Sequence, residues 1–282
     1  MRRAAGWYNG AVAATVTDAD AAHLRTFGFV VLPGAIDPGP LAAELDAALR
    51  DGARAGFAVN GGPGVSGAYV PMMVERTPVS LGLLDRFAAD AEALVDRPVL
   101  PLRAKGVRYA ADASWHRDSE LPVTSIGFAA YLEPLDAATG ALRVLPGSHH
   151  ATYGDVVGSH VADGDPGGVP APAFPGLPLA TEPGDVIVFD EHLFHASAGG
   201  RHRRQWRVDY VVDPVGADEE AAVRRWFADT YPPDWDGGYD VDAFPTYGPA
   251  WLASGRPWLA RLDELGAHAA SAAEEDGVRR RR

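Results

Sequence analysis

The chain of 282 residues contains no cysteine. Disulfides, zinc-thiolate sites, iron–sulfur clusters and a thiol nucleophile are therefore excluded, and any metal ion must be held by His, Asp or Glu. The sequence also lacks a run of about 18 apolar residues, so we expect no membrane-spanning helix. The apolar run after Met-Arg-Arg is broken at residues 7–10 and is too short for a signal peptide, which predicts a cytoplasmic protein.

Positive charge is scarce, with 25 Lys and Arg against 38 Asp and Glu and a formal net charge of −13. Nucleic acid is not an expected partner, because its binding needs clustered cations to neutralise phosphates. The chain is 47% hydrophobic and 22% charged, which is ordinary for a globular protein with a sizeable core. We expect a monomer or a homodimer that acts on a small molecule.

Helical patterns come first in the chain and short strands follow. Thr17, Asp37 and Ser80 are candidate N-caps of three helices, and residues 52–68 are rich in glycine and indicate a mobile loop. The strand candidates are 99–109, 125–132, 141–145, 179–181, 185–189 and 205–212. This order of elements predicts a mainly β sandwich or barrel with flanking helices.

One domain over residues 1–266 accounts for this organisation. Its parts are a helical N-terminal support (17–98), a β core (about 99–212) and an acidic, aromatic C-terminal segment (213–266). Residues 267–282 are predicted to be a disordered tail. The loop 154–178 and the segment 213–242 are two candidates for a lid.

A histidine and an aspartate stand two residues apart in the stretch Trp115–Ser119. Residues i and i+2 of a strand point to the same side, so His116 and Asp118 can bind one metal ion. Together with a second histidine they would form the facial triad that suits non-haem Fe(II) and leaves coordination positions open. The pair alone is a weak signal, and it needs a later histidine on another strand.

The run 186–190 predicts a strand that leads to two further histidines, His192 and His195. Either histidine could complete a metal site with His116 and Asp118. Arginines follow at positions 201, 203, 204 and 207. An arginine beside the metal suits a carboxylate cosubstrate, because guanidinium matches the two carboxylate oxygens.

Four segments, taken in this order, resemble the phytanoyl-CoA dioxygenase family of Fe(II)- and 2-oxoglutarate-dependent oxygenases. The segments are Phe27–Gly34, Trp115–Asp118, Gly140–His149 and Pro183–Ser197. The resemblance spans roughly residues 17–212. It implies a double-stranded β-helix, also called a jelly roll, which agrees with the strand candidates.

The family's metal ligands fall on His116, Asp118 and His195. His195 is preferred to His192 because it precedes the small residues that follow the family's distal histidine. The resemblance implies Fe(II), 2-oxoglutarate and O2 as cofactor and cosubstrates, with release of succinate and CO2. Because Asp118 keeps the carboxylate that halogenases of this kind replace by a small residue, oxygenation is expected over halogenation.

The arginine for 2-oxoglutarate follows the distal histidine in this family. Arg204 shares one strand face with apolar neighbours, whereas Arg203 and Arg207 share the other with polar ones. An apolar face is expected to look into the barrel, so Arg204 is the first choice and Arg207 the second. The remaining candidates are Lys105 for the cosubstrate, and Trp115 and Ser119 for the substrate pocket.

The segment 213–242 combines nine acids with interleaved Trp and Tyr residues. Such a segment could form the wall of a polar, cationic site, because carboxylates pair with ammonium groups and rings stack on sugar or alkyl faces. We therefore expect hydroxylation or oxidative cyclisation of an amino acid or an aminoglycoside- or aminocyclitol-type metabolite. The alternative is that the segment is a solvated helix and loop without a role in binding.

Two other functions use the same fold. One is a binding module that has lost its metal, which the intact set of three ligands disfavours. The other is a cupin-like metal-dependent hydrolase or isomerase with the same ligands. The second function does not need an arginine beyond the distal histidine.

Overall fold

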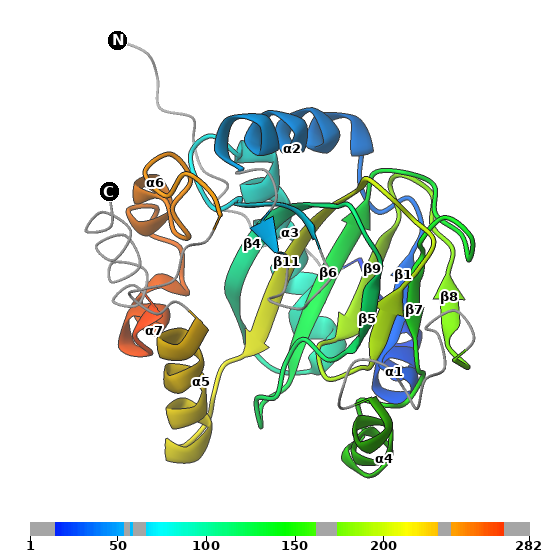
Figure 1. Cartoon of the computed structure of the whole chain (residues 1–282). Helices are drawn as coiled ribbons and strands as arrows, with labels where there is room; N and C mark the ends of the chain where they lie inside the picture. The colour runs from blue at the N-terminus through cyan, green and yellow to red at the C-terminus, as the bar shows by residue number, and fades with distance from the viewer. Residues whose placement is uncertain (1–14, 54–56, 59–65, 162–173, 231–237, 268–282) are drawn as a thin grey trace.

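Two antiparallel sheets face each other in the computed structural model, which describes residues 15–53, 57–58, 66–161, 174–230 and 238–267 (Figure 1). The larger sheet has the order β1 (Phe29–Leu32), β9 (Val186–Asp190), β6 (Ser125–Tyr131), β11 (Arg203–Val212), β4 (Val99–Tyr109), β3 (Ser66–Pro71) and β2 (Phe57–Ala58). The smaller sheet has the order β5 (Ala113–His116), β10 (His195–Ser197), β7 (Leu142–Val144) and β8 (Leu177–Leu179). This is the predicted jelly roll, and its interior lies between the sheets.

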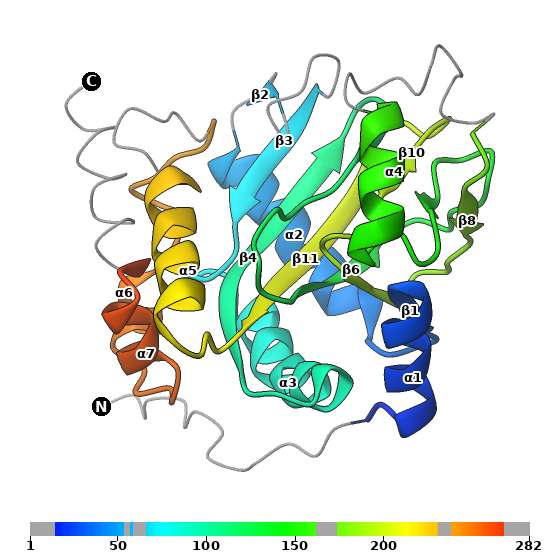
Figure 2. The ribbon, with the colours of Figure 1, turned by 90° about the horizontal axis from the view of Figure 1, so that it is seen from below.

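Helices cover the outer faces of both sheets. Those on the N-terminal side are α1 (Asp18–Phe27), α2 (Pro38–Gly52) and α3 (Pro78–Val95), and α2 and α3 pack on the larger sheet. On the smaller sheet, α4 (Ala151–Val161) packs through Val157 and Val161 against Trp115. The C-terminal helices α5 (Ala217–Thr230), α6 (Pro249–Leu252) and α7 (Leu259–Glu264) gather beside the β4 side of the larger sheet (Figure 2).

Strand β11 lies between β4 and β6 and has two different faces. Trp206 and Tyr210 point outward to α3, where the Trp206 indole nitrogen donates to the Ser80 hydroxyl at 2.7 Å and the Tyr210 hydroxyl donates to the Leu84 carbonyl. The charged face, which includes Arg207, therefore looks into the barrel. The expectation that the apolar face looks inward was wrong, because α3 supplies an apolar partner on the outside.

The C-terminal residues share the core of the larger sheet. Trp251 and Phe227 belong to the same buried cluster as Leu84 of α3. The Tyr247 hydroxyl donates to the Leu102 carbonyl of β4 at 2.6 Å. The described part of the C-terminal segment is thus built into the fold by apolar packing.

Most predicted elements are present, with differences at their ends. Thr17 caps α1 together with Asp20, and the third helix begins at Pro78, so Thr77 takes the N-cap position that was assigned to Ser80. The glycine-rich stretch 52–68 contains the start of β3, and the predicted loop 154–178 begins inside α4. Residues 268–282 of the predicted tail lie outside the described residues. No described helix is long and apolar enough to span a membrane.

The contact between Trp206 and Ser80 gives a test of how β11 is anchored. Both side chains are fully buried. In Ser80→Ala the indole donor loses its acceptor, which should lower the free energy of unfolding by about 1–3 kcal/mol. Urea unfolding measures this change. Trp206→Phe removes the hydrogen-bond donor itself, so adding Ser80→Ala to that variant should lower the free energy of unfolding by less than in the wild type. An equal loss in both backgrounds would show that the hydrogen bond is unimportant.

Candidate active site

The pairing of β5 with β10 brings the two predicted histidine ligands together. His116 at the end of β5 lies opposite His195 at the start of β10. Asp118 follows in the next loop, where its backbone N–H donates to the Glu191 carbonyl at 2.9 Å. The loop is thereby tied to the chain just before the second histidine.

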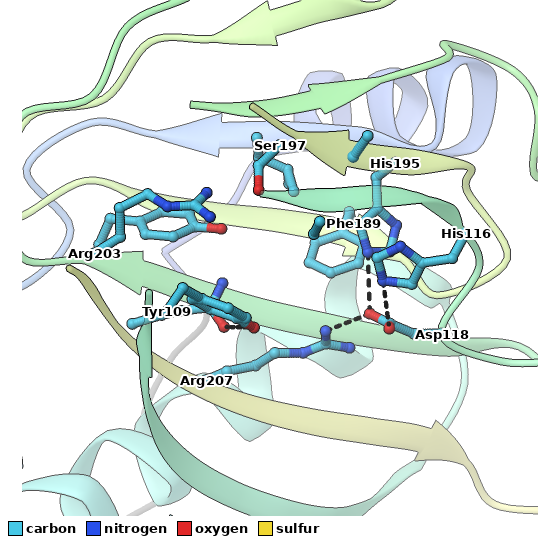
Figure 3. A pocket seen from close by; sticks show the side chains of 13 residues that line it. Tyr109, His116, Asp118, Phe189, His195, Ser197, Arg203 and Arg207 are labelled. Carbon is cyan, nitrogen blue, oxygen red and sulfur yellow. Dashed lines mark hydrogen bonds and ion pairs between the residues drawn. The ribbon is translucent and has the colours of Figure 1, made fainter. Parts of the chain in front are cut away.

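The three side chains converge on one point inside the barrel (Figure 3). Asp118 Oδ1 is 3.4 Å from His116 Nε2, and Asp118 Oδ2 is 3.4 Å from His195 Nε2. One candidate ligand atom from each residue lies within 4.8 Å of the others. Two imidazole nitrogens and a carboxylate oxygen at this spacing can hold a single metal ion.

Backbone carbonyls fix both imidazoles in the form that a metal needs. His116 Nδ1 is 2.7 Å from the Ser114 carbonyl oxygen, and His195 Nδ1 is 2.9 Å from that of Leu193. A carbonyl oxygen only accepts, so each Nδ1 carries the hydrogen and donates it. Each Nε2 points toward Asp118 and is the nitrogen that the neutral imidazole would offer to a metal ion.

The electrostatics of the site favour an ionised aspartate between two imidazoles. Burial alone would raise the pKa of Asp118, but the charge of Arg207 and the contacts with both histidines hold it well below its usual range. Burial and the neighbouring His116 lower the pKa of His195. Burial lowers the pKa of His116, but its contact with Asp118, the charge of that carboxylate and the Ser114 carbonyl together raise it.

A pocket extends from the triad into the barrel. Arg203 stands at its far end next to Tyr109, with Ser197 between them and the triad (Figure 3). The lining includes Tyr109, Ala113, Tyr131, Leu142, Phe189, Ala196, Ser197, Arg203, Gln205 and Arg207 besides the triad. The pocket therefore carries a cation at the end opposite to the candidate ligands.

Arg203 has no carboxylate within ion-pair distance among the described residues. Its two terminal nitrogens donate to the carbonyls of Gly140 and Ala111, each at 2.8 Å, and its buried Nε has no partner. A buried guanidinium without a counter-charge is unfavourable. A carboxylate ligand entering the pocket would supply that counter-charge.

Arg207, the second candidate from the sequence for binding the cosubstrate, lines the pocket beside the triad. Its guanidinium forms ion pairs with Asp118, Glu191 and Asp209. The Asp118 and Glu191 pairs use its two terminal nitrogens, and the Asp209 pair uses Nε. Its charge is therefore already neutralised by the chain itself.

Arg204, the first choice of the sequence, lies outside the pocket. It sits on the outer face of β11 and pairs with Glu133 at 2.6 Å and Asp46 at 2.7 Å. Lys105 is buried and does not line the pocket, and its nearest acid is Asp209 at 3.8 Å. Neither position suits contact with a ligand in this pocket.

The two predicted substrate residues also point elsewhere. Trp115 precedes a ligand on a strand, so its side chain faces the opposite side and packs under α4 against Phe174. Ser119 is buried, and its hydroxyl accepts from the Leu121 N–H at 3.2 Å. Neither residue is among those that line this pocket.

Ser197 and Tyr109 are pocket residues that the sequence reasoning missed. Ser197 stands two positions after His195. Because residues i and i+2 of a strand face the same side, this spacing could have predicted Ser197 as a pocket residue. Tyr109 could not be predicted from the sequence, because the side of the sheet that it faces depends on the pairing of β4 with β11. In that pairing Tyr109 lies opposite Arg203.

The described acids of the segment 213–242 do not line the pocket. Asp213 and Glu220 bind Arg261 at 2.9 and 2.7 Å, and Glu219 binds Arg97 at 3.2 Å. Residues 231–237 lie outside the described residues. Asp213, Glu219 and Glu220 therefore serve the packing of the C-terminal helices, and the described acids of this segment give no support to a cationic substrate in this pocket.

Comparisons with known proteins agree with this geometry. A model of the phytanoyl-CoA dioxygenase (PhyH) family matches residues 24–205. No curated protein matches the chain significantly. Among solved structures, the chain is similar to SnoN, a non-heme alpha ketoglutarate dependent epimerase from nogalamycin biosynthesis, with 20% identity over 68% of this chain and 81% of that chain and a TM-score of 0.52.

Two further structures are similar at the level of the fold. One is HygX from Streptomyces hygroscopicus with nickel, 2-oxoglutarate and hygromycin B bound, with 18% identity, 70% of this chain and 88% of that chain covered, and a TM-score of 0.52. The other is EvdMO1, with 24% identity over 68% of this chain and a TM-score of 0.50. The chain spans about half of EvdMO1, 49% of its length.

A jelly roll with two histidines and an aspartate at one end of its pocket is typical of non-haem iron enzymes that use 2-oxoglutarate. The family model covers well over half of the 282 residues. The chain belongs to the phytanoyl-CoA dioxygenase family.

His192, the histidine not chosen as a ligand, holds the loop after Asp118 in place. Its Nδ1 is 2.8 Å from Asp190 Oδ1, and its Nε2 is 2.7 Å from the Leu121 carbonyl oxygen. Both partners are acceptors, so both bonds form only when the imidazole is protonated. Burial lowers the pKa of His192, but the bond to Asp190 and its charge outweigh burial and raise it.

The stability contributed by His192 should therefore depend on pH. It is fully present below the unfolded-state pKa of histidine and is lost as pH rises through the raised folded-state pKa. His192→Gln should cost about 1–2 kcal/mol in unfolding free energy at about pH 5.5 and less at about pH 8.5. Urea titrations at both pH values measure it. His160→Gln, at an exposed position of α4, is the control. A cost for His192→Gln that is the same at both pH values would contradict the prediction.

Proposed function

We propose that this enzyme couples the oxidative decarboxylation of 2-oxoglutarate to the oxidation of a small polar molecule. In this proposal His116, Asp118 and His195 hold Fe(II), and Arg203 binds the far carboxylate of 2-oxoglutarate. The observation that carries it is the pocket with three metal-ligand atoms at one end and a guanidinium without a counter-charge at the other.

The donor set fits Fe(II). Two neutral imidazoles and one carboxylate leave coordination positions open, which a cosubstrate and O2 require. The carbonyls of Ser114 and Leu193 hold a hydrogen on each Nδ1, so Nε2 is the nitrogen that each neutral imidazole offers to the metal. When bound, the iron with 2-oxoglutarate activates O2, and the reaction yields succinate, CO2 and the oxidised substrate.

In this proposal an extended diacid lies between the metal ligands and Arg203, which stand at opposite ends of the pocket lining. Its guanidinium offers a buried positive charge, and Ser197 and Tyr109 add hydroxyl groups beside it. A carboxylate bound there would form charge-assisted hydrogen bonds with the buried guanidinium. We therefore assign the cosubstrate to Arg203, in place of Arg204 and Lys105, which lie outside the pocket, and of Arg207, whose charge is already compensated.

Asp118 supports oxygenation as the type of reaction. A carboxylate at this position occupies the site that a halide would need, so hydroxylation is the default outcome. Desaturation or oxidative ring closure would use the same residues. The proposed substrate is a small polar molecule, because Tyr131, Gln205 and Ser197 give the pocket a polar lining. HygX and SnoN, whose structures contain hygromycin B and a nogalamycin compound, are consistent with small molecules as substrates.

A cupin-like hydrolase or isomerase with the same ligands is disfavoured by Arg203. Such an enzyme has no need for a buried cation at the far end of the pocket. A metal-free binding module is disfavoured by the two imidazoles held ready for a metal. Both alternatives predict that no succinate is formed.

The reaction class is tested with anaerobic protein, Fe(II) and 2-oxoglutarate. Chelation of the iron by the keto acid should give a visible charge-transfer absorption band. Admission of O2 should then bleach the band and release succinate, faster in the presence of a substrate. The controls are His116→Ala and His195→Ala, which should abolish the band. A wild-type protein without band and without succinate would refute the proposal.

The role of Arg203 is tested by Arg203→Gln and compared with Arg204→Gln on the opposite face. Loss of the charge-assisted bonds should raise the KM for 2-oxoglutarate about 10- to 100-fold. Binding of Fe(II) alone should change little, because Arg203 stands at the other end of the pocket. Steady-state kinetics and anaerobic titration measure the two effects. An unchanged KM in Arg203→Gln, or an equal increase in Arg204→Gln, would contradict the assignment.

A further inference from the structure

Arg207 joins the candidate metal ligand Asp118 to two other buried acids. Each nitrogen of its guanidinium faces a different carboxylate: Nη1 faces Asp118, Nη2 faces Glu191 and Nε faces Asp209. The side chain of Arg207 is 5% exposed, and those of its three partners are 1–11% exposed. The fork is therefore held on three sides inside the barrel.

The charges of this group are balanced within the protein. Arg103 pairs with Asp209 at 2.6 Å, and Lys105 lies 3.8 Å from the same carboxylate. Burying so many charges is unfavourable unless their geometry is closely matched, and an apolar cluster of similar volume is often as stable. Stability alone therefore does not explain this buried group of charges. The contact of Arg207 with Asp118 suggests a role at the metal site.

Arg207 constrains one oxygen of Asp118. It binds Oδ2, which also lies 3.4 Å from His195 Nε2, whereas Oδ1 lies toward His116 Nε2 and has no contact with the guanidinium. Glu191 holds the same aspartate by a second route, because its backbone carbonyl accepts the Asp118 N–H while its side chain binds Arg207. Both the backbone and the carboxylate of Asp118 are therefore oriented by one set of contacts.

The space around the guanidinium is shaped to its position. Gly127 of β6 lies against it, and a Cβ at this glycine would come within 2.9 Å of Nε and Nη2. On another side, the Phe189 ring centroid is 4.7 Å from Cζ, and the same ring packs against His195 at 5.1 Å. A displaced guanidinium would disturb contacts that reach two of the three candidate ligands.

We propose that Arg207 is a positioning residue of the metal centre, which holds Asp118 by Oδ2 so that a single oxygen is presented to the ion. The inference rests on the proposed function, since it requires Asp118 to be a metal ligand. A carboxylate that gives one oxygen leaves more coordination positions for the cosubstrate and O2. Arginine suits this task better than lysine, because its planar fork fixes directions as well as supplying charge.

Two variants separate position from charge. Arg207→Lys keeps the charge and loses the fork. Gly127→Ala leaves every charge in place and moves the guanidinium by contact with the new methyl group. Arg204→Lys is the matched control, since it makes the same change on the same strand at the outer face, where the side chain pairs with Asp46 and Glu133.

Co(II) binding to the metal-free protein, without 2-oxoglutarate and under argon, is the measurement. Partners that orient a ligand are commonly worth 10- to 100-fold in metal affinity, so Arg207→Lys and Gly127→Ala should weaken Co(II) binding by about that factor. The visible bands of bound Co(II), which report its ligand geometry, should also shift. Arg204→Lys should keep both the affinity, within about twofold, and the spectrum.

The outcomes are distinct. Wild-type affinity and spectrum in both Arg207→Lys and Gly127→Ala would overturn the inference alone, while the proposed function would stand. Equal weakening in Arg204→Lys would also overturn it, because the effect would then be a general one on the fold. If Arg207→Lys does not fold, Gly127→Ala decides. Failure of the wild-type protein to bind Co(II) would overturn the proposed function and this inference with it.

Discussion

Charge buried inside a β-barrel is the constraint on which this molecule depends. Arg203 and Arg207 point into the interior from one strand, where water is largely excluded and each charge needs a partner. The chain supplies carboxylates for Arg207 and carbonyls for Arg203. The outer face of the same strand is satisfied by α3, and this packing decides which arginines face inward. The position of a helix on the outside thus sets the chemistry of the pocket on the inside.

The geometry of the triad follows from a short antiparallel pairing. His116 and His195 are direct neighbours across β5 and β10, so their rings lie 4.3 Å apart without help from long loops. The carbonyls two residues before each histidine hold its Nδ1, which makes the orientation of the rings a local property of the two strand ends. Only Asp118 depends on distant contacts, through the backbone of Glu191 and the side chain of Arg207.

This difference explains what the sequence could predict. The spacing of His116 and Asp118 and the order of the strands are local patterns, and they predicted a metal-binding pair in a mainly β sandwich or barrel. The resemblance to the phytanoyl-CoA dioxygenase family then implied the jelly roll and the choice of His195 as the third ligand. The inward face of β11 is not a local pattern, because it depends on Trp206 finding Ser80 on a helix more than 100 residues earlier in the chain. The same holds for Trp115, which α4 covers, and for the ion pairs of Asp213 and Glu220 with Arg261 and of Glu219 with Arg97, which join residues far apart in sequence.

Arg203, Arg204 and Arg207 lie within five positions, and the sequence alone does not tell their roles apart. The groups that each guanidinium meets in the folded protein decide its role. Arg204 meets two partly exposed acids on the outer face, where pairs of this kind contribute little to stability. Arg207 meets three buried acids, so it has no charge left for a ligand but can orient the carboxylates that it binds. Arg203 has carbonyl partners only among the described residues, which leaves its charge for an anion. Because a guanidinium stays protonated in all three settings, its partners alone decide whether it anchors the fold, orients a metal ligand or receives a substrate carboxylate.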